Sequence, residues 1–443
     1  MSAADHESSL DVADLERLAV AADLIGRDGD SADVWARAHQ ECLRLGNVPR
    51  AARCAFWLAL SLLLRGEMAR DGGWLSRARR LLDGHEDCVE QGYLLVPVAL
   101  QSMAEGDAAK ACTTFSQAGE IGNRFQDPDL LTLGRLGRGQ ALIHLGEVSE
   151  GVALLDEAMV AVTTGEISPI VAGLAYCAVI EACQEIFDVR RAQEWTTALS
   201  SWCDSQPDLV LYRGQCLVHR SELLQMHGDW QVAMDETHRA RERLSQPTGQ
   251  AAIGMAFYQQ AELHRLWGEF EVADEAYREA SQYGRAPMPG LAQLRLAQGQ
   301  ADSAETAIRR ALEEAQDRVS RSKLIPAYVE IMLATGDIQA ARVAADELEE
   351  IAGKLDSLFL NAVCAHATGA VLFHEGLPQA ALVPLRRAWR AWSDLQAPYE
   401  AARTRVLVGF ACRGLGDKDA AEMELNAARR VFQQLGAAPD LAG

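Results

Sequence analysis

The sequence lacks a long hydrophobic run, a surplus of basic residues and a secretory leader. Its longest nearly apolar stretch, from Cys54 to Leu64, has 11 residues, too few to span a bilayer as a helix. The first 16 residues are polar and acidic, without a basic start and an apolar segment, so we expect no export signal. Acidic residues outnumber basic ones by 63 to 42, and a net charge of −21 repels nucleic-acid phosphates and anionic lipid. We therefore expect no direct binding of nucleic acid or membrane by this chain.

Paired cysteine spacings and catalytic signatures are also missing. Ten cysteines are scattered, mostly inside apolar helical runs where the thiol acts as a small hydrophobic group, and this favours a reducing, cytoplasmic location. Neither HExxH nor the serine nucleophile elbow occurs. We therefore expect a protein that is not an enzyme and that holds no cofactor or metal.

A turn residue recurs along almost the whole chain. The intervals between successive turn positions are 40, 40, 40, 41, 41, 40, 31, 37, 40 and 40 residues. Such a period predicts a stacked repeat array in which each unit covers the apolar face of its neighbour. These turn positions are Gly26, Gly66, Gly106, Gly146, Phe187, Gly228, Gly268, Gly299, Gly336, Gly376 and Gly416.

Mostly small residues stand seven positions before, five after and twelve after each turn position, as at Ala99, Ala111 and Ala118 around Gly106. Larger residues such as Leu385 fill between them, which predicts two antiparallel helices that interdigitate closely. The residue after the turn is acidic in eight of eleven units, where it suits the start of a second helix. Each unit is thus predicted to be a helix, a turn and a second helix.

These small-residue spacings resemble those of the tetratricopeptide repeat, with a period about six residues longer than its usual 34. The prediction is an all-α fold, a right-handed α-solenoid of about eleven tetratricopeptide-like hairpins. HEAT-type repeats are the alternative because their period is nearer 40, although they lack the triplet of small sites. Residues 1–12 are predicted to be a flexible N-terminus. The array is predicted to run as one continuous solenoid over 13–284 and 285–440, with a joint and a shortened helix at Pro287-Met288-Pro289-Gly290.

Four longer segments carry a further resemblance: residues 172–230, 256–281, 324–337 and 397–417. They resemble the long repeat region of LuxR-type transcription regulators, and the likeness spans roughly residues 10 to 442. This resemblance implies a sensory, oligomerising or partner-binding role, ahead of a C-terminal helix-turn-helix domain that binds DNA. The 443 residues end with VFQQLGAAPDLAG and include no recognition helix, so no residue here is assigned to DNA binding. We expect either the repeat part of a longer regulator or an adaptor without a DNA-binding domain.

Two clusters of chemically interesting residues are better explained by packing. Gly134, Gly137 and Gly139 lack the order of a phosphate loop and a preceding strand, so we interpret them as helix-packing glycines. Cys364, His366, His374 and Glu375 share one helix, but Cys364 and His366 lie about 200° apart around its axis. A metal needs converging ligands, so we interpret them as a buried cysteine and ordinary surface residues.

A polar stripe follows the repeat. Six residues before the turn position, six consecutive units carry Gln or Glu, and the residue three before the turn lies on the same helix face. In tetratricopeptide repeats this face resembles the lining of the concave groove. The groove candidates are Glu181, Gln184, Glu222, Gln225, Glu262, Arg265 and Glu330, with an apolar end at Phe56, Leu60 and Leu100.

Two interpretations of this stripe stay open. It is either a recognition strip for an extended or helical peptide, or for a cationic small ligand, or it is a solvated wall whose apolar members pack inside the superhelix. The functional expectation is a repeat scaffold that resembles the ligand- or partner-sensing region of a LuxR-type regulator, with homo-oligomers among its expected assemblies. The alternative is a stand-alone cytosolic adaptor that binds proteins or peptides in its groove.

Overall fold

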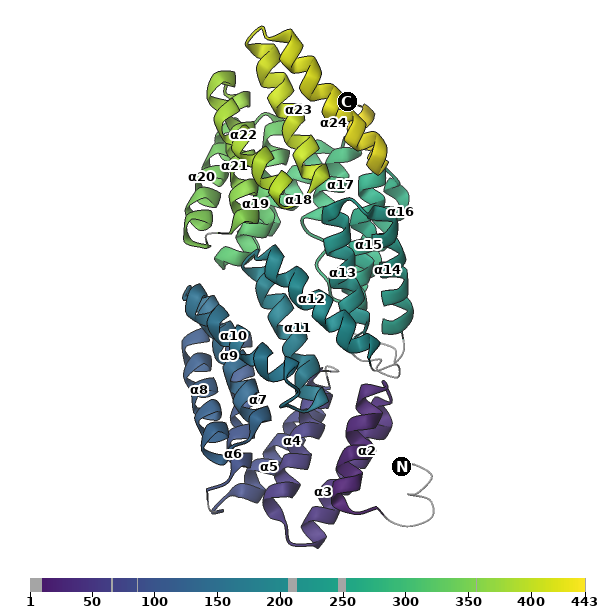
Figure 1. Cartoon of the computed structure of the whole chain (residues 1–443), viewed down its shortest axis with the longest axis vertical. Coiled ribbons are helices and arrows are strands. Elements are labelled where there is room, and N and C mark those ends of the chain that lie inside the picture. Colours follow the sequence, from purple (N-terminus) through teal and green to yellow (C-terminus); the bar gives the residue numbers. More distant parts are fainter. Residues whose placement is uncertain are drawn as a thin grey trace. The chain divides into compact units, whose positions relative to one another are not determined.

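The computed structural model describes residues 10–64, 67–85, 87–205, 213–245, 252–355 and 357–442, and these residues form helices without any strand. The predicted turn at Gly66 and most of the predicted flexible N-terminus lie outside the described residues. Packing divides the chain into two units (Figure 1). The first comprises 1–182, 194–216 and 245–250, and the second comprises 183–193, 217–244 and 251–443. This division passes through α11–α13, and the predicted joint near residue 285 stays a prediction.

The helices of the first unit pair in chain order, for example α4 with α5 and α8 with α9. Their bounds are α2 Val12–Leu24, α3 Asp28–Arg44, α4 Val48–Leu64, α5 Met68–Leu82, α6 Val89–Tyr93, α7 Leu95–Ala104, α8 Ala108–Phe125, α9 Pro128–Leu145 and α10 Val148–Thr163. Three helices are shared between the units: α11 Pro169–Glu185, α12 Val189–Asp204 and α13 Arg213–His227.

The second unit repeats the same pairing, for example α15 with α16 and α21 with α22. Its helices are α14 Trp230–Leu244, α15 Ile253–Trp267, α16 Phe270–Gln282, α17 Gly290–Ala297, α18 Ala301–Glu314, α19 Arg318–Thr335, α20 Ile338–Leu355, α21 Leu358–His374, α22 Pro378–Asp394, α23 Pro398–Gly414, α24 Lys418–Leu435 and α25 Ala438–Ala442. The shortened helix predicted after Pro289 is confirmed, because α17 has only 8 residues. The predicted all-α fold of tetratricopeptide-like hairpins is confirmed.

The turn positions adopt the left-handed backbone that the glycine pattern predicts. Every described turn glycine has a positive φ, between 74° at Gly26 and 91° at Gly146. Phe187, which replaces glycine in one unit, keeps the same conformation with φ of 59°. A side chain in this region costs roughly 1–2 kcal/mol, so the phenylalanine is held there by its surroundings.

The small sites let the helices of a hairpin approach closely. A Cβ added to Gly369 would stand 2.5 Å from Cγ of Leu385, and one added to Gly409 would stand 2.7 Å from Cγ of Leu425. In the first unit, a Cβ on Gly134 would lie 2.7 Å from Cα of Gly119 on α8. These distances are too short for real Cβ contacts, so small and large residues interdigitate as predicted, and the glycine cluster at 134–139 serves packing.

The acidic residue after the turn caps the second helix only when it is aspartate. Asp107 and Asp417 accept hydrogen bonds from the backbone N–H three residues on, whereas Glu67, Glu147 and Glu269 make no such bond. The glutamate side chain is one methylene longer, and short side chains are the ones that favour this cap. The acid at the start of the second helix thus forms a cap at Asp107 and Asp417 and none at these glutamates.

Candidate functional site

The second unit encloses a cavity of about 960 Å³. Its lining comes mainly from the first helices of successive hairpins, α13, α17, α19, α21 and α23, together with α25 at one end. Many of the lining residues stand three, six, ten, thirteen or sixteen positions before a turn, which is one face of a helix. The concave face that the polar stripe predicts is thus hollow in this unit.

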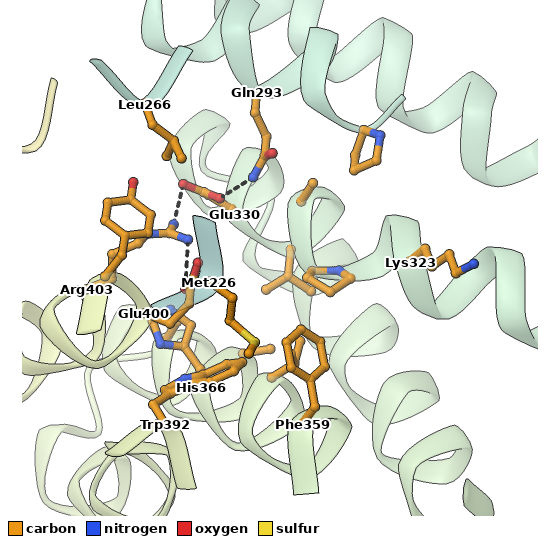
Figure 2. A pocket seen from close by; sticks show the side chains of 18 of the residues that line it. Met226, Leu266, Gln293, Lys323, Glu330, Phe359, His366, Trp392, Glu400 and Arg403 are labelled. Carbon is orange, nitrogen blue, oxygen red and sulfur yellow. Dashed lines mark hydrogen bonds and ion pairs between the residues drawn. The ribbon is translucent and has the colours of Figure 1, made fainter. Parts of the chain in front are cut away.

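A chain of polar contacts forms one end of the cavity (Figure 2). Glu330 on α19 accepts a hydrogen bond from Gln293 Nε2 at 3.2 Å and one from Arg403 at 2.7 Å, through different carboxylate oxygens. Arg403 also donates to Glu400 at 3.5 Å, and the side chain of Tyr399 donates to Asp440 at 3.0 Å. One guanidinium therefore links Glu400 on its own helix to Glu330, which precedes Arg403 by 73 residues.

Charge and burial set the protonation of this end. Burial would raise the pKa of Glu330, but the Arg403 guanidinium and the Gln293 amide hold that pKa below its usual range. Burial raises the pKa of Glu400 and of Asp440, and Arg403 offsets the rise only in part. Three carboxyl groups thus share a single guanidinium, and two of them are poorly compensated.

His366 on α21 faces the same end as a neutral imidazole. Its Nδ1 lies 2.9 Å from Oγ1 of Thr404, and that hydroxyl itself donates to the backbone carbonyl of Glu400 at 2.8 Å. Nδ1 must therefore carry the proton, which leaves Nε2 as a hydrogen-bond acceptor. Burial, with Arg403 nearby, lowers the pKa of His366 to about 3. The imidazole is neutral at physiological pH.

The apolar wall is built from aromatic rings. Phe187 stacks on Phe359 with centroids 5.8 Å apart and planes within 7°, and Trp392 meets Phe359 edge to face at 5.2 Å. The carbonyl of Phe187 accepts a hydrogen bond from Ser357 at 2.6 Å, which helps to hold its left-handed backbone. Met226 completes this wall (Figure 2).

The cavity also has a second polar group of residues. Gln184 Nε2 donates to Glu222 at 2.5 Å and lies 3.1 Å from Nδ1 of buried His219. Burial would raise the pKa of Glu222, but the hydrogen bonds from His219 and Gln184 lower it, so Glu222 is ionised at neutral pH. Gln225 accepts from Gln259 at 2.6 Å.

Four of the ten predicted groove residues line this cavity: Gln184, Glu222, Gln225 and Glu330. Glu262 and Arg265 do not line it, because they pair with each other at 2.6 Å and Tyr277 donates to the second oxygen of Glu262. Glu181 is exposed on α11 in the part that belongs to the first unit.

The apolar end of the predicted groove needs correction. Phe56 is fully buried and Leu60 is 6% exposed, both inside the hydrophobic core of the first unit. Leu100 is half-buried and packs against the same core. The prediction that Phe56 and Leu60 line a groove is wrong, because an apolar side chain at this position lets neighbouring helices close over it.

Sequence reasoning missed His366, Glu400 and Arg403. His366 was interpreted as an ordinary surface histidine, yet it stands ten residues before Gly376, on the face of the predicted stripe. Arg403 and Glu400 stand thirteen and sixteen residues before Gly416. Extending the stripe toward the helix N-terminus, to the positions ten, thirteen and sixteen residues before the turn, would have found all three residues.

The first unit has a cavity of its own, of about 860 Å³. Some of its polar residues pair: Arg53 donates to Glu90 at 2.8 Å, and Tyr93 donates to Asp127 at 2.8 Å, whereas Arg53 Nε and Ser168 Oγ are buried without a partner among the described residues. Asp129 accepts from the backbone N–H of Ser168 at 2.7 Å. This cavity lies beside the helix ends and interhelical turns, away from the stripe positions.

In the described part of the chain, no three His, Cys, Asp or Glu side chains converge as a metal site. No helix there is both long and apolar enough to cross a bilayer.

Comparison with known proteins gives distant structural likenesses. No family model and no curated protein matches the chain. A chain of the APC/C hetero-tetramer Cut9–Hcn1 is 16% identical over 93% of this chain and 85% of its own, with a TM-score of 0.39. A Rap protein complexed with competence and sporulation factor is 11% identical over 87% and 99%, with a TM-score of 0.44. Yeast Tom70 is 11% identical over 97% and 96%, with a TM-score of 0.37. Such scores carry no inference about function.

Proposed function

We propose that this chain is a partner-binding scaffold, and that the cavity of the second unit holds a segment of a partner protein or peptide. The observation that supports this most is the hollow face itself. Successive first helices present the same positions to one space of about 960 Å³, which is large enough for several side chains. Apolar rings and converging polar groups line it together, the combination typical of binding sites.

Binding would act by linking repeats. A segment in the cavity contacts several first helices at once, from α13 to α23. It therefore favours the arrangement of hairpins that binds it most tightly. The resemblance to LuxR-type regulators makes the sensing region of a transcription regulator the more specific form of this proposal. The stand-alone adaptor is the alternative. The coding sequence past Gly443 distinguishes them, because a helix-turn-helix domain there supports the regulator.

A peptide display library selected on the full chain tests the proposal. Ala334 is exposed and lines the cavity, so Ala334→Trp should fill the space without disturbing the core. Val343→Trp is the matched control, because Val343 is 59% exposed on α20 and does not line the cavity. We expect selected peptides to bind the wild type and Val343→Trp equally, and to lose at least tenfold in affinity for Ala334→Trp. Equal binding to all three proteins would contradict the proposal.

A further inference from the structure

We propose that the cavity selects a cationic partner segment, whose ammonium or guanidinium group meets Glu400 and Asp440 while a neighbouring apolar side chain packs on Phe187 and Phe359. This inference rests on the proposed function and names the chemistry of the partner. Neither the repeat pattern nor the fold class dictates it. It depends on the charges, the unused hydrogen-bond acceptors and the ring wall of this one cavity.

The first step is the charge at the polar end. Glu330, Glu400 and Asp440 line it together with a single guanidinium, that of Arg403. Lys323 also lines the cavity, but it is exposed and extends away from Glu330 (Figure 2). Arg265 acts on the same carboxyl groups from behind, but Glu262 already neutralises it. With all three carboxyl groups ionised, this end lacks two positive charges, and a bound cation would supply one of them.

The second step is the set of unused acceptors. Both oxygens of Glu330 are engaged, by Gln293 and by Arg403. Among the described residues, Oε1 of Glu400 and Oδ1 of Asp440 accept no side-chain or backbone hydrogen bond, and neither does Nε2 of His366. An ammonium group donates three hydrogen bonds and a guanidinium five, so either can use these acceptors. An anion would find Arg403 already occupied and would meet the carboxylates.

The third step is a buried donor. Trp392 lines the cavity and is 2% exposed, and its indole Nε1 has no acceptor among the described residues. A buried donor without a partner costs stability, so the site favours a ligand that brings an acceptor once the Trp392 side chain rotates to bring its inaccessible Nε1 to the cavity surface. A peptide carbonyl is such an acceptor, and a peptide carries it within a few ångströms of a basic side chain. A cation, a carbonyl and an apolar group together describe a basic, partly apolar peptide segment.

The fourth step is the apolar wall. Phe187 keeps a strained backbone so that its ring stacks on Phe359, beside Met226. A glycine at this turn would avoid the strain but would remove the ring from the cavity. The wall therefore offers an aromatic surface for an apolar side chain that neighbours the cation.

The library selection described above gives a first test. We expect the selected peptides to be enriched in Lys or Arg next to an aromatic or aliphatic residue. Binding peptides enriched in Asp or Glu, or without charge preference, would overturn the charge inference while the proposed function stands. A selection that yields no cavity-dependent peptide would overturn both.

Matched probes give the sharper test. Each selected peptide is compared with a copy in which norleucine replaces the basic residue, and with a copy acetylated at its N-terminus. We expect norleucine to weaken binding at least tenfold. Loss on acetylation alone would identify the terminal ammonium group as the recognised cation. Equal affinities of all three peptides would contradict the inference.

Two variants locate the effect. Glu400→Gln/Asp440→Asn should abolish the preference for the basic peptide over the norleucine peptide and leave affinity for the latter within about twofold. Glu349→Gln/Glu422→Gln is the control, since it removes the same charge from exposed sites outside the cavity. If the preference survives in the first variant, or falls equally in both, the cation does not bind at Glu400 and Asp440.

Discussion

One repeat of the first unit and three of the second use the same position of their first helices in opposite ways. Six residues before the turn, the first unit carries Leu60, which is 6% exposed inside a core. At that position the second unit carries Glu222, Gln293 and Glu330, which line a cavity. An apolar side chain gains by closing the space between helices, whereas a carboxylate loses its hydration if the space closes. The difference teaches that polarity at this position contributes to whether a repeat is filled or hollow, although Ala370 and Phe410, which are apolar at the same position, also line the cavity.

The cavities of the two units both gather carboxyl groups around one guanidinium. In the first unit, Arg53 pairs with Glu90, and Tyr93 pairs with Asp127. In the second unit, Glu400 and Asp440 share Arg403 with Glu330 and keep free oxygens. In the first unit a third carboxyl group, that of Asp129, accepts from a backbone N–H, while Arg53 Nε and Ser168 Oγ lack a partner among the described residues, so neither network is complete.

The largest expected effect comes from exchanging the two kinds of side chain. Leu60→Gln should destabilise the first unit by about 3–5 kcal/mol, because it buries an unpaired amide and loses apolar packing. The reverse change in the second unit, Gln293→Leu, should cost only about 1–2 kcal/mol, because the residue borders open space and loses just its hydrogen bond to Glu330. Urea unfolding of both variants measures the difference. Similar losses for the two changes would show that the units do not differ as described.

A smaller effect is expected from adding one methyl group where the two helices of a hairpin approach closely. Gly134→Ala in the first unit should cost about 1–3 kcal/mol, because its neighbour is the backbone of Gly119. Gly369→Ala in the second unit should cost less, because its nearest neighbour is the movable side chain of Leu385. Thermal unfolding of each variant beside the wild type checks the order. A larger loss for Gly369→Ala would contradict it.

The pH dependence should separate the polar end of the second cavity from ordinary surface acids. The folded state raises the pKa of Glu400, so its ionisation weakens the fold as pH rises from the unfolded pKa through the folded one. We therefore expect Glu400→Gln to be as stable as the wild type at pH 7, or more stable by up to about 1 kcal/mol, and to lose this advantage at pH 4. Denaturant titrations at the two pH values, with Glu349→Gln as control, measure it. An advantage that grows toward pH 4 would exclude this explanation.

The smallest expected effect on stability is at the strained turn. Phe187→Gly relieves roughly 1–2 kcal/mol of backbone strain and loses a ring stack worth about 0.5–1.5 kcal/mol. The net change in unfolding free energy should stay within about 1 kcal/mol. Binding of a selected peptide should nevertheless weaken, because the ring leaves the cavity wall. Unchanged affinity by fluorescence anisotropy would show that Phe187 serves only the fold.

Much of the fold could be predicted because it depends on short-range patterns. Turn glycines, the small residues between paired helices and aspartate caps act within one hairpin, so their spacing is visible in the sequence. The site was only partly predictable. Glu330 was found by its register, but its partner Arg403 is 73 residues away, and no spacing rule pairs them. Phe56 was misplaced because exposure of a helix face depends on how closely the next repeat approaches.

The glutamates after three of the turns have a practical consequence. Glu67, Glu147 and Glu269 stand where Asp107 and Asp417 hold a backbone amide, yet their side chains make no such bond. Replacing each glutamate by aspartate offers a route to a more heat-resistant protein, and each exchange should raise the free energy of unfolding by about 0.5–1 kcal/mol. These exchanges lie at exposed helix starts outside both cavities, so robustness can be engineered without altering recognition.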